Sequence, residues 1–171
     1  YPHLKSLTQM WDAHLVENGK GQLITPDGWS PEHGQVRGAD GRIFIKEGDR
    51  TPQPGASYDQ QIIWDLFTNF IEASTALDAD PELRAHIFER RARLLGPKIG
   101  GWGQIQEWVD DVDDPKQDYR HIGQLFALYP GRQITPMLTP DFAAAAKVTL
   151  NSRSDKSCGW SRAWKLCFWS R

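Results

Sequence analysis

The sequence predicts an all-α fold in which helical hairpins alternate with long loops. Apolar residues recur at helical spacing in several segments, most clearly over residues 58–77. Strands capable of forming a parallel sheet are missing between these segments, which argues against an α/β fold. The order is helix, long loop, helix, short turn, helix and again a long loop. This order is typical of part of a toroid of helical hairpins.

Each element is expected from its apolar spacing and its end signals. Helices are expected at residues 3–17, 57–77, 80–95, 121–129, 139–150 and 159–171. Ser57 and Ser157 are candidate caps, and Pro81 suits the first turn of its helix. Residues 19–55 and 100–118 are rich in Gly, Pro, Asp and Ser, with one short strand expected at 42–45. Loops of this length are usually functional or disordered, and their aromatic and carboxylate content favours function.

Length and charge limit the function classes. The 171 residues suffice for one domain, and the last helix stops without a cap signal, so residues 1–171 are expected to be a single fragment truncated at both ends. A formal net charge of −2 gives no reason to expect nucleic acid or an anionic membrane as a partner. The apolar runs are too short for a transmembrane helix.

The chain is rich in tryptophan, with eight among its 171 residues. Most are explained by a core, but Trp29, Trp102 and Trp160 lie in segments rich in Gly, Pro and Ser. Flat indole rings in loops are a common means of stacking on sugar rings. The three tryptophans therefore suggest a carbohydrate site.

Two carboxylates lie in constrained loops near these tryptophans. Glu32 directly follows Pro31, and Asp155 precedes the last expected helix. Such a pair is the minimal equipment for glycoside hydrolysis, in which one acid protonates the departing oxygen and a base directs water. Each also has a structural explanation, as an exposed surface glutamate and as a charge at a helix start. The acidic run at 110–114 lacks the spacing of a calcium loop, so no metal is expected.

Five motifs carry a family resemblance. In chain order they are Ser-Pro-Glu (30–32), Tyr-Asp-Gln-Gln-Ile-Ile-Trp-Asp-Leu-Phe (58–67), Gly-Gln-Ile-Gln-Glu-Trp (103–108), Arg-His-Ile (120–122) with Leu-Tyr-Pro-Gly (128–131), and Gly-Trp-Ser-Arg-Ala-Trp-Lys (159–165). Together they resemble the catalytic domain of glycoside hydrolase family 95, the α-1,2-L-fucosidases. The resemblance runs nearly from end to end.

The resemblance implies an (α/α)6 barrel, no cofactor, and hydrolysis of terminal fucose with inversion. The substrate would be a fucosylated oligosaccharide or glycan, and the location extracellular or periplasmic. Glu32 would be the general acid and Asp155 the base. The substrate-binding residues are expected beside them and in the matching motifs, at Trp29, His33, Trp102, Glu107, His121 and Trp160.

Departures from the family pattern limit these expectations. The family's barrel begins upstream of Tyr1, and that part holds the paired asparagines that polarise the attacking water, so the isolated chain is expected to be inactive or nearly so. Gly123 and Gln124 stand where the family usually has Ser and His. A non-catalytic sugar-binding remnant and a helical interaction module remain open, as does the choice between fucose and L-galactose. An incomplete toroid would also expose apolar faces and associate with itself.

Overall fold

The computed structural model describes residues 1–156 and 158–171, so the expected cap Ser157 lies outside the described residues. The helices are α1 (Pro2–His14), α2 (Ser57–Ala76), α3 (Pro81–Arg93), α4 (Pro140–Asn151) and α5 (Gly159–Trp169), and a 3₁₀ turn, η1, spans Gly123–Leu125. The strands are β1 (Val16–Glu17), β2 (Leu23–Ile24), β3 (His33–Arg37) and β4 (Ile43–Glu47), paired as two antiparallel hairpins. The regular structure is mostly helical, as the sequence predicts, but the described residues form no closed barrel.

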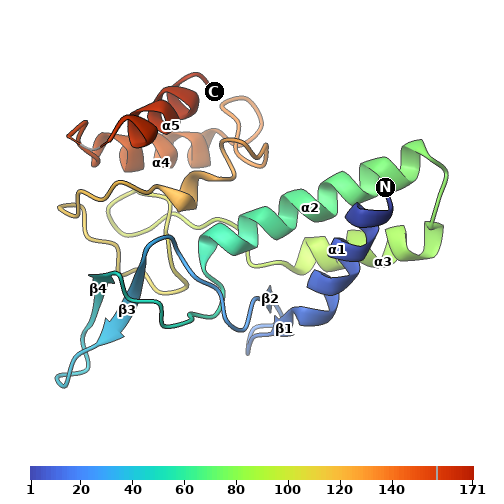
Figure 1. Ribbon diagram of the computed structural model, residues 1–171, viewed down its shortest axis with the longest axis horizontal. Coiled ribbons are helices and arrows are strands. Elements are labelled where there is room, and N and C mark those ends of the chain that lie inside the picture. The colour runs from blue at the N-terminus through green and yellow to red at the C-terminus, as the bar shows by residue number, and fades with distance from the viewer. Residues whose placement is uncertain (157) are drawn as a thin grey trace.

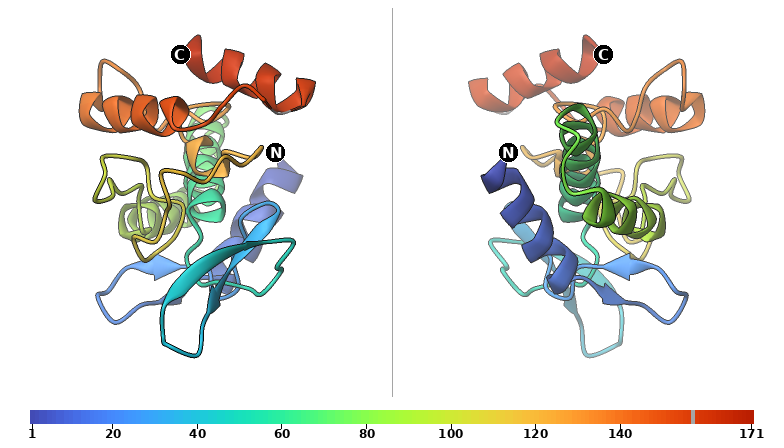
Figure 2. Two further views of the ribbon diagram at one scale, coloured as in Figure 1. Left: turned by 90° about the vertical axis from the view of Figure 1, so that its left-hand side faces the viewer. Right: turned by 90° about the vertical axis from the view of Figure 1, so that its right-hand side faces the viewer.

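The helices form two groups with separate cores. In Figure 1, α1, α2 and α3 lie together on the right, while α4 and α5 lie at the upper left, on the side of the N-terminal end of α2. The two side views show the same separation (Figure 2). The buried residues of the first core are Leu15, Leu23, Ile63, Phe67, Phe70, Ile87 and Leu94. The second core contains Ile105, Ile122, Leu125, Ala127, Leu128, Ile134, Ala143, Ala145, Ala146, Leu150 and Phe168.

One buried side chain of α2 joins the two groups. The amide of Gln61 donates from Nε2 to the carbonyl of Gln124 at 2.8 Å, and its Oε1 accepts from the backbone N–H of Ala127 at 2.7 Å. Because Gln61 is only 2% exposed, these bonds satisfy polar groups that water does not reach. The η1 segment is therefore held against the first half of α2.

The same bonds explain why the helix expected at 121–129 is wrong beyond one 3₁₀ turn. The carbonyl of Gln124 and the N–H of Ala127 bind a side chain of another element instead of continuing a helical ladder. The cap expected at Ser57 is also wrong, because Ala56 occupies the N-cap of α2. Pro81 does begin α3, as expected.

The loop expected at residues 19–55 contains most of the strands. The strand expected at 42–45 is confirmed within β4, which pairs in register with β3 from His33 opposite Glu47 to Arg37 opposite Ile43. The sequence did not predict β3, since His33-Gly34-Gln35 has no apolar alternation. The hairpin begins directly after Glu32 and so fixes where that residue lies.

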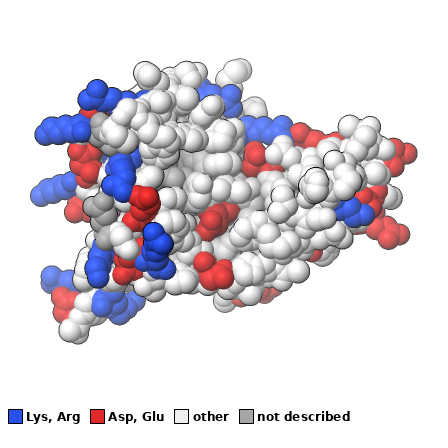
Figure 3. Space-filling view, viewed as in Figure 1, with Lys and Arg blue, Asp and Glu red and all other residues white. Residues whose placement is uncertain are grey.

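The surface agrees with the nearly neutral composition. In Figure 3 charged side chains of both signs mingle along the left margin of the face, while its middle is mostly uncharged. None of the described helices is long and apolar enough to cross a membrane.

Candidate active site

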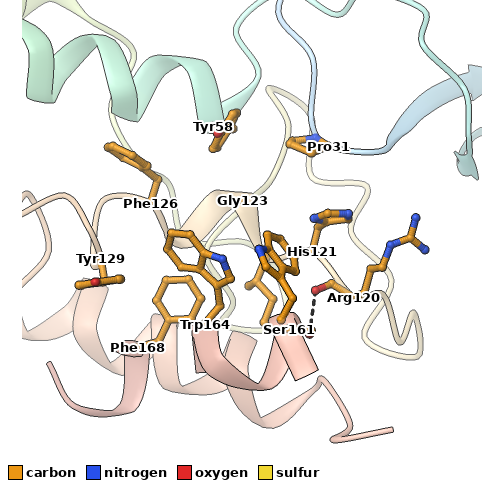
Figure 4. Close-up of a pocket in the computed structure, with 12 residues that line it drawn as sticks. Pro31, Tyr58, Arg120, His121, Gly123, Phe126, Tyr129, Ser161, Trp164 and Phe168 are labelled. Carbon is orange, nitrogen blue, oxygen red and sulfur yellow. Dashed lines mark hydrogen bonds between the residues drawn. The ribbon is translucent and has the colours of Figure 1, made fainter. Parts of the chain in front are cut away.

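A cavity of about 300 Å³ lies between the start of α2, the η1 segment and one face of α5. Its walls are mainly aromatic, and Figure 4 shows Trp164 and His121 facing Tyr58 and Pro31 across it. The lining residues are Pro31, Tyr58, Arg120, His121, Ile122, Gly123, Phe126, Tyr129, Trp160, Ser161, Trp164 and Phe168. A concave site of this size with a few polar groups at one end suits a small ligand.

Glu32 does not line the cavity itself, but its carboxylate contacts Arg120 and His121, which do. Its side chain is about half exposed, and its carboxylate forms an ion pair with Arg120. Nε2 of His121 lies 3.2 Å from the same carboxylate oxygen. The hydrogen bond from Arg120, and then that from His121, lowers the pKa of Glu32 below its usual range. Glu32 is therefore held as a carboxylate while Arg120 stays in contact.

His121 connects Glu32 to the wall formed by α5. The ring of Trp160 packs edge-on against that of His121, with 4.9 Å between the ring centroids, and against that of Trp164, with 6.0 Å between the centroids. The hydroxyl of Ser161 donates to the carbonyl of Arg120 at 2.9 Å, which ties the start of α5 to the same segment (Figure 4). His121 and Trp160 thus line the cavity, and Glu32 lies next to it through its contact with His121.

Asp155 is placed differently. It is not one of the cavity-lining residues, and its side chain is 83% exposed. Its carboxylate lies 3.5 Å from Nζ of Lys165, and its carbonyl accepts from Nε of Arg162 at 2.7 Å. The described contacts of Asp155 are therefore with α5 and not with Glu32.

Trp29 and Trp102 also lie outside the cavity lining. The backbone N–H of Trp29 donates to Asp59 at 2.8 Å, and its indole N–H donates to the carbonyl of Asp49 at 3.3 Å. The indole N–H of Trp102 donates to the carbonyl of Asp113 at 3.1 Å. Both indoles hold loops together through these bonds.

His33 and Glu107 are buried behind the cavity instead of lining it. Nε2 of His33 lies 2.8 Å from Oε1 of Glu107, with the side chains 1% and 2% exposed. The approach is close but lacks hydrogen-bond alignment, so it is a polar contact that becomes an ion pair only in the protonated state of His33. The hydroxyl of Ser30 donates to the same oxygen of Glu107.

Sequence reasoning missed much of the aromatic wall. Trp160, Trp164 and Phe168 recur every four residues, and this spacing places all three on one face of α5. That stripe was the available signal, but by itself it also fits an ordinary core face. Tyr58 and Gly123 come together only through the fold, where a Cβ on Gly123 would lie 3.3 Å from the Tyr58 ring.

Asp113 is a partly buried acid that accepts a hydrogen bond from the backbone N–H of Glu107. Burial, and then the nearby charge of Glu107, raises the pKa of Asp113 to about 6. In the unfolded chain its pKa is near 3.8, so between these values the folded state binds a proton that the unfolded state releases. This acid therefore lowers stability as the pH rises from about 4 to about 6, and the loss persists above that range.

We expect Asp113→Asn to be more stable than the parent chain by about 1–3 kcal/mol at pH 7.5, with the difference vanishing below pH 4. The amide oxygen can still accept from the N–H of Glu107, which now donates to Asp113 at 3.0 Å. Urea unfolding across this pH range measures the difference. Asp110→Asn, at an exposed neighbour, is the control. If the free energies of unfolding of Asp113→Asn and of the parent chain change with pH in parallel, the raised pKa of Asp113 is contradicted.

Comparisons with known proteins agree with the five motifs. The model of the glycosyl hydrolase family 95 catalytic domain matches residues 1–171. The protein "Alpha-L-fucosidase 2" of Arabidopsis thaliana is 31% identical over 174 residues, covering 100% of this chain and 20% of that protein. The "Probable alpha-fucosidase A" of Aspergillus niger is 32% identical over 182 residues, covering 99% of this chain and 21% of that protein. The chain spans about a fifth of the length of these relatives. Since the family model matches the chain over its whole length, the chain belongs to glycosyl hydrolase family 95.

Proposed function

We propose that this chain is the part of a family 95 glycoside hydrolase that supplies the general acid, Glu32, for cleavage of terminal α-L-fucosides. One observation carries the proposal: the carboxyl group of Glu32 contacts Arg120 and His121, two polar residues that line an aromatic-walled cavity. Aromatic rings offer apolar faces to a sugar, while charged side chains bind its hydroxyl groups. Both curated relatives carry fucosidase names, which supports fucose as the sugar.

The proposed chemistry is inversion at the anomeric carbon of an α-1,2-linked fucose. Glu32 would protonate the leaving oxygen, and Asp155 would act as the base toward water on the opposite face. The role of Asp155 rests on the family resemblance, because its described contacts are with Lys165 and Arg162. The helical hairpins would belong to an (α/α)6 barrel in the whole domain.

A general acid must carry a proton, whereas Arg120 and His121 lower the pKa of Glu32. The proposal therefore requires the substrate to displace Arg120 from the carboxylate. A sugar over the mouth of the cavity would compete for Arg120 and exclude water, and both effects raise the pKa of Glu32. The ion pair is then the resting state of the acid.

Ligand binding by the isolated chain is the first test. We expect L-fucose to change the tryptophan fluorescence of the chain, and Trp160→Ala to weaken that response, because Trp160 lines the cavity and is 52% exposed. Trp169→Ala, at a half-exposed tryptophan that does not line the cavity, is the control. Lack of any response to L-fucose would count against the sugar site.

A sugar-binding remnant without catalysis is the second candidate. It is favoured by the aromatic walls and by the absence of Asp155 from the cavity lining. Binding without turnover, even when the chain is joined to the rest of a family 95 catalytic domain, would establish it. The helical interaction module is the third, and absence of both binding and turnover would favour it.

Self-association of the isolated chain is expected from its exposed apolar residues. Met137, Leu138 and Leu166 are 91%, 84% and 72% exposed. Contact between copies would remove this surface from water. Sedimentation velocity should therefore show a rise in mean mass with concentration, which Leu138→Ser and Leu166→Ser together should reduce. A monomer over a wide concentration range would contradict it.

A further inference from the structure

Glu32 lies on a turn whose two ends meet one buried oxygen. The N–H of His33 donates to the carbonyl of Ser30 at 3.1 Å and closes the turn around Pro31 and Glu32. The hydroxyl of Ser30 and Nε2 of His33 both contact Oε1 of Glu107. The ends of the turn cannot separate without breaking one of these contacts.

The anchor is rigid because it is buried. Ser30 and His33 are fully buried, and Glu107 is 2% exposed. The ring of His33 packs edge-on against those of Tyr119 and Trp108, with centroid distances of 4.4 Å and 5.9 Å. Since a buried polar group without partners is costly, the contacts of Glu107 with Ser30 and His33 are favoured. None of the anchor residues lines the cavity, and all three are at most 2% exposed, so they are not placed to touch a sugar there.

The backbone on both sides holds the anchor in place. The carbonyl of Glu107 accepts from the N–H of Ser57, the first residue of α2, at 3.0 Å. The carbonyl of Glu32 accepts from the N–H of Gly48, just after β4, at 2.9 Å. The turn is therefore held between a long helix and a hairpin, which suits a site that needs fixed geometry.

We propose that Glu107, with His33 and Ser30, positions the carboxyl group of Glu32 for proton transfer. The inference rests on the proposed function of Glu32. It gives Glu107 and His33 a role through Glu32 in place of the sugar contacts expected from the sequence. Small displacements of a reacting group are costly, so release of the turn should lower kcat by about 10- to 100-fold.

The kinetic test uses residues 1–171 joined to the remaining parts of a family 95 catalytic domain. Glu107→Gln is expected to lower kcat by about 10- to 100-fold with little change in KM, because the sugar contacts remain. Ser30→Ala removes one of the two contacts to Glu107 and should give a smaller loss of the same kind. A raised KM with unchanged kcat would show a sugar contact and overturn the proposal.

A second variant pair separates this inference from the proposed function. If Glu107 acts through Glu32, Glu107→Gln should cause no further loss in the Glu32→Gln background. Full activity of Glu32→Gln alone would refute the proposed function, whatever Glu107 does. An inactive Glu32→Gln together with an unaltered kcat for Glu107→Gln would refute the positioning role alone.

If Glu107→Gln does not fold, the positioning role can still be tested by a measurement that needs no catalysis. The carboxyl group of Glu32 can be titrated by NMR in the 171-residue chain. Ser30→Ala should move the pKa of Glu32 toward its ordinary value, because a loosened turn weakens the contact with Arg120. Phe70→Leu, a core change away from the turn, should leave this pKa unchanged. Equal pKa values in Ser30→Ala and the parent chain would contradict the anchor.

Discussion

Replacing Glu32 by glutamine is expected to reduce fucose release from a fucosylated oligosaccharide by at least about 1,000-fold. The enzyme assayed consists of residues 1–171 joined to the remaining parts of a family 95 catalytic domain. Glutamine fills the same space but cannot donate the proton that an alkoxide leaving group requires. General acid catalysis contributes about 10²- to 10⁴-fold, so a deficit of this size fits loss of the acid. The measurement is kcat/KM on a fucosylated oligosaccharide.

A second substrate with a different leaving group distinguishes loss of the acid from loss of the base. A nitrophenolate departs without protonation, so Glu32→Gln should retain far more activity on a nitrophenyl fucoside than on the oligosaccharide. Asp155→Asn, if Asp155 is the base, should lose similar factors on both substrates, since both need activated water. Glu89→Gln, at an exposed position of α3, is the matched control. Equal losses on the two substrates would show that Glu32 is not the acid.

Replacing Phe67 by alanine is expected to destabilise the chain by about 3–5 kcal/mol. Phe67 is fully buried in the core between α1, α2 and α3, so its removal loses apolar burial and leaves a cavity. The free energy of unfolding of a domain is only about 5–15 kcal/mol, so this single change removes a large part of it. Urea unfolding of the purified chain gives the difference directly.

Phe44→Ala is the matched control for Phe67→Ala. The substitution is the same, but Phe44 is 52% exposed on β4, and its loss should cost less than about 1 kcal/mol. If both variants lose the same free energy, the core assigned to α2 is not what stabilises the chain.

The sequence predicts the helices better than the site. The apolar spacing of α2 and the proline that begins α3 are local signals, and both elements are confirmed. The helix expected at 121–129 is wrong because Gln61 binds two backbone groups of that segment, 63 and 66 residues away along the chain. Such a bond leaves no trace in the local pattern.

In the site, too, a local feature could be predicted from the sequence and a long-range one could not. The constraint on Glu32 could be read from Pro31 beside it, since proline restricts the chain locally. The burial of Glu107 could not, because a carboxylate in a polar, glycine-rich segment is ordinarily exposed. Its burial follows from the approach of Ser30 and His33, which depends on how the chain folds back on itself.

The close approach of Gly123 to Tyr58 has an evolutionary consequence. Any larger residue at 123 would press on the tyrosine ring, so its effect depends on which side chain occupies position 58. A serine at 123, where the family usually has one, requires the ring at position 58 to lie slightly farther away. Family members with this serine are therefore expected to differ from the present chain in the placement of that ring, although 64 residues separate the two positions along the chain.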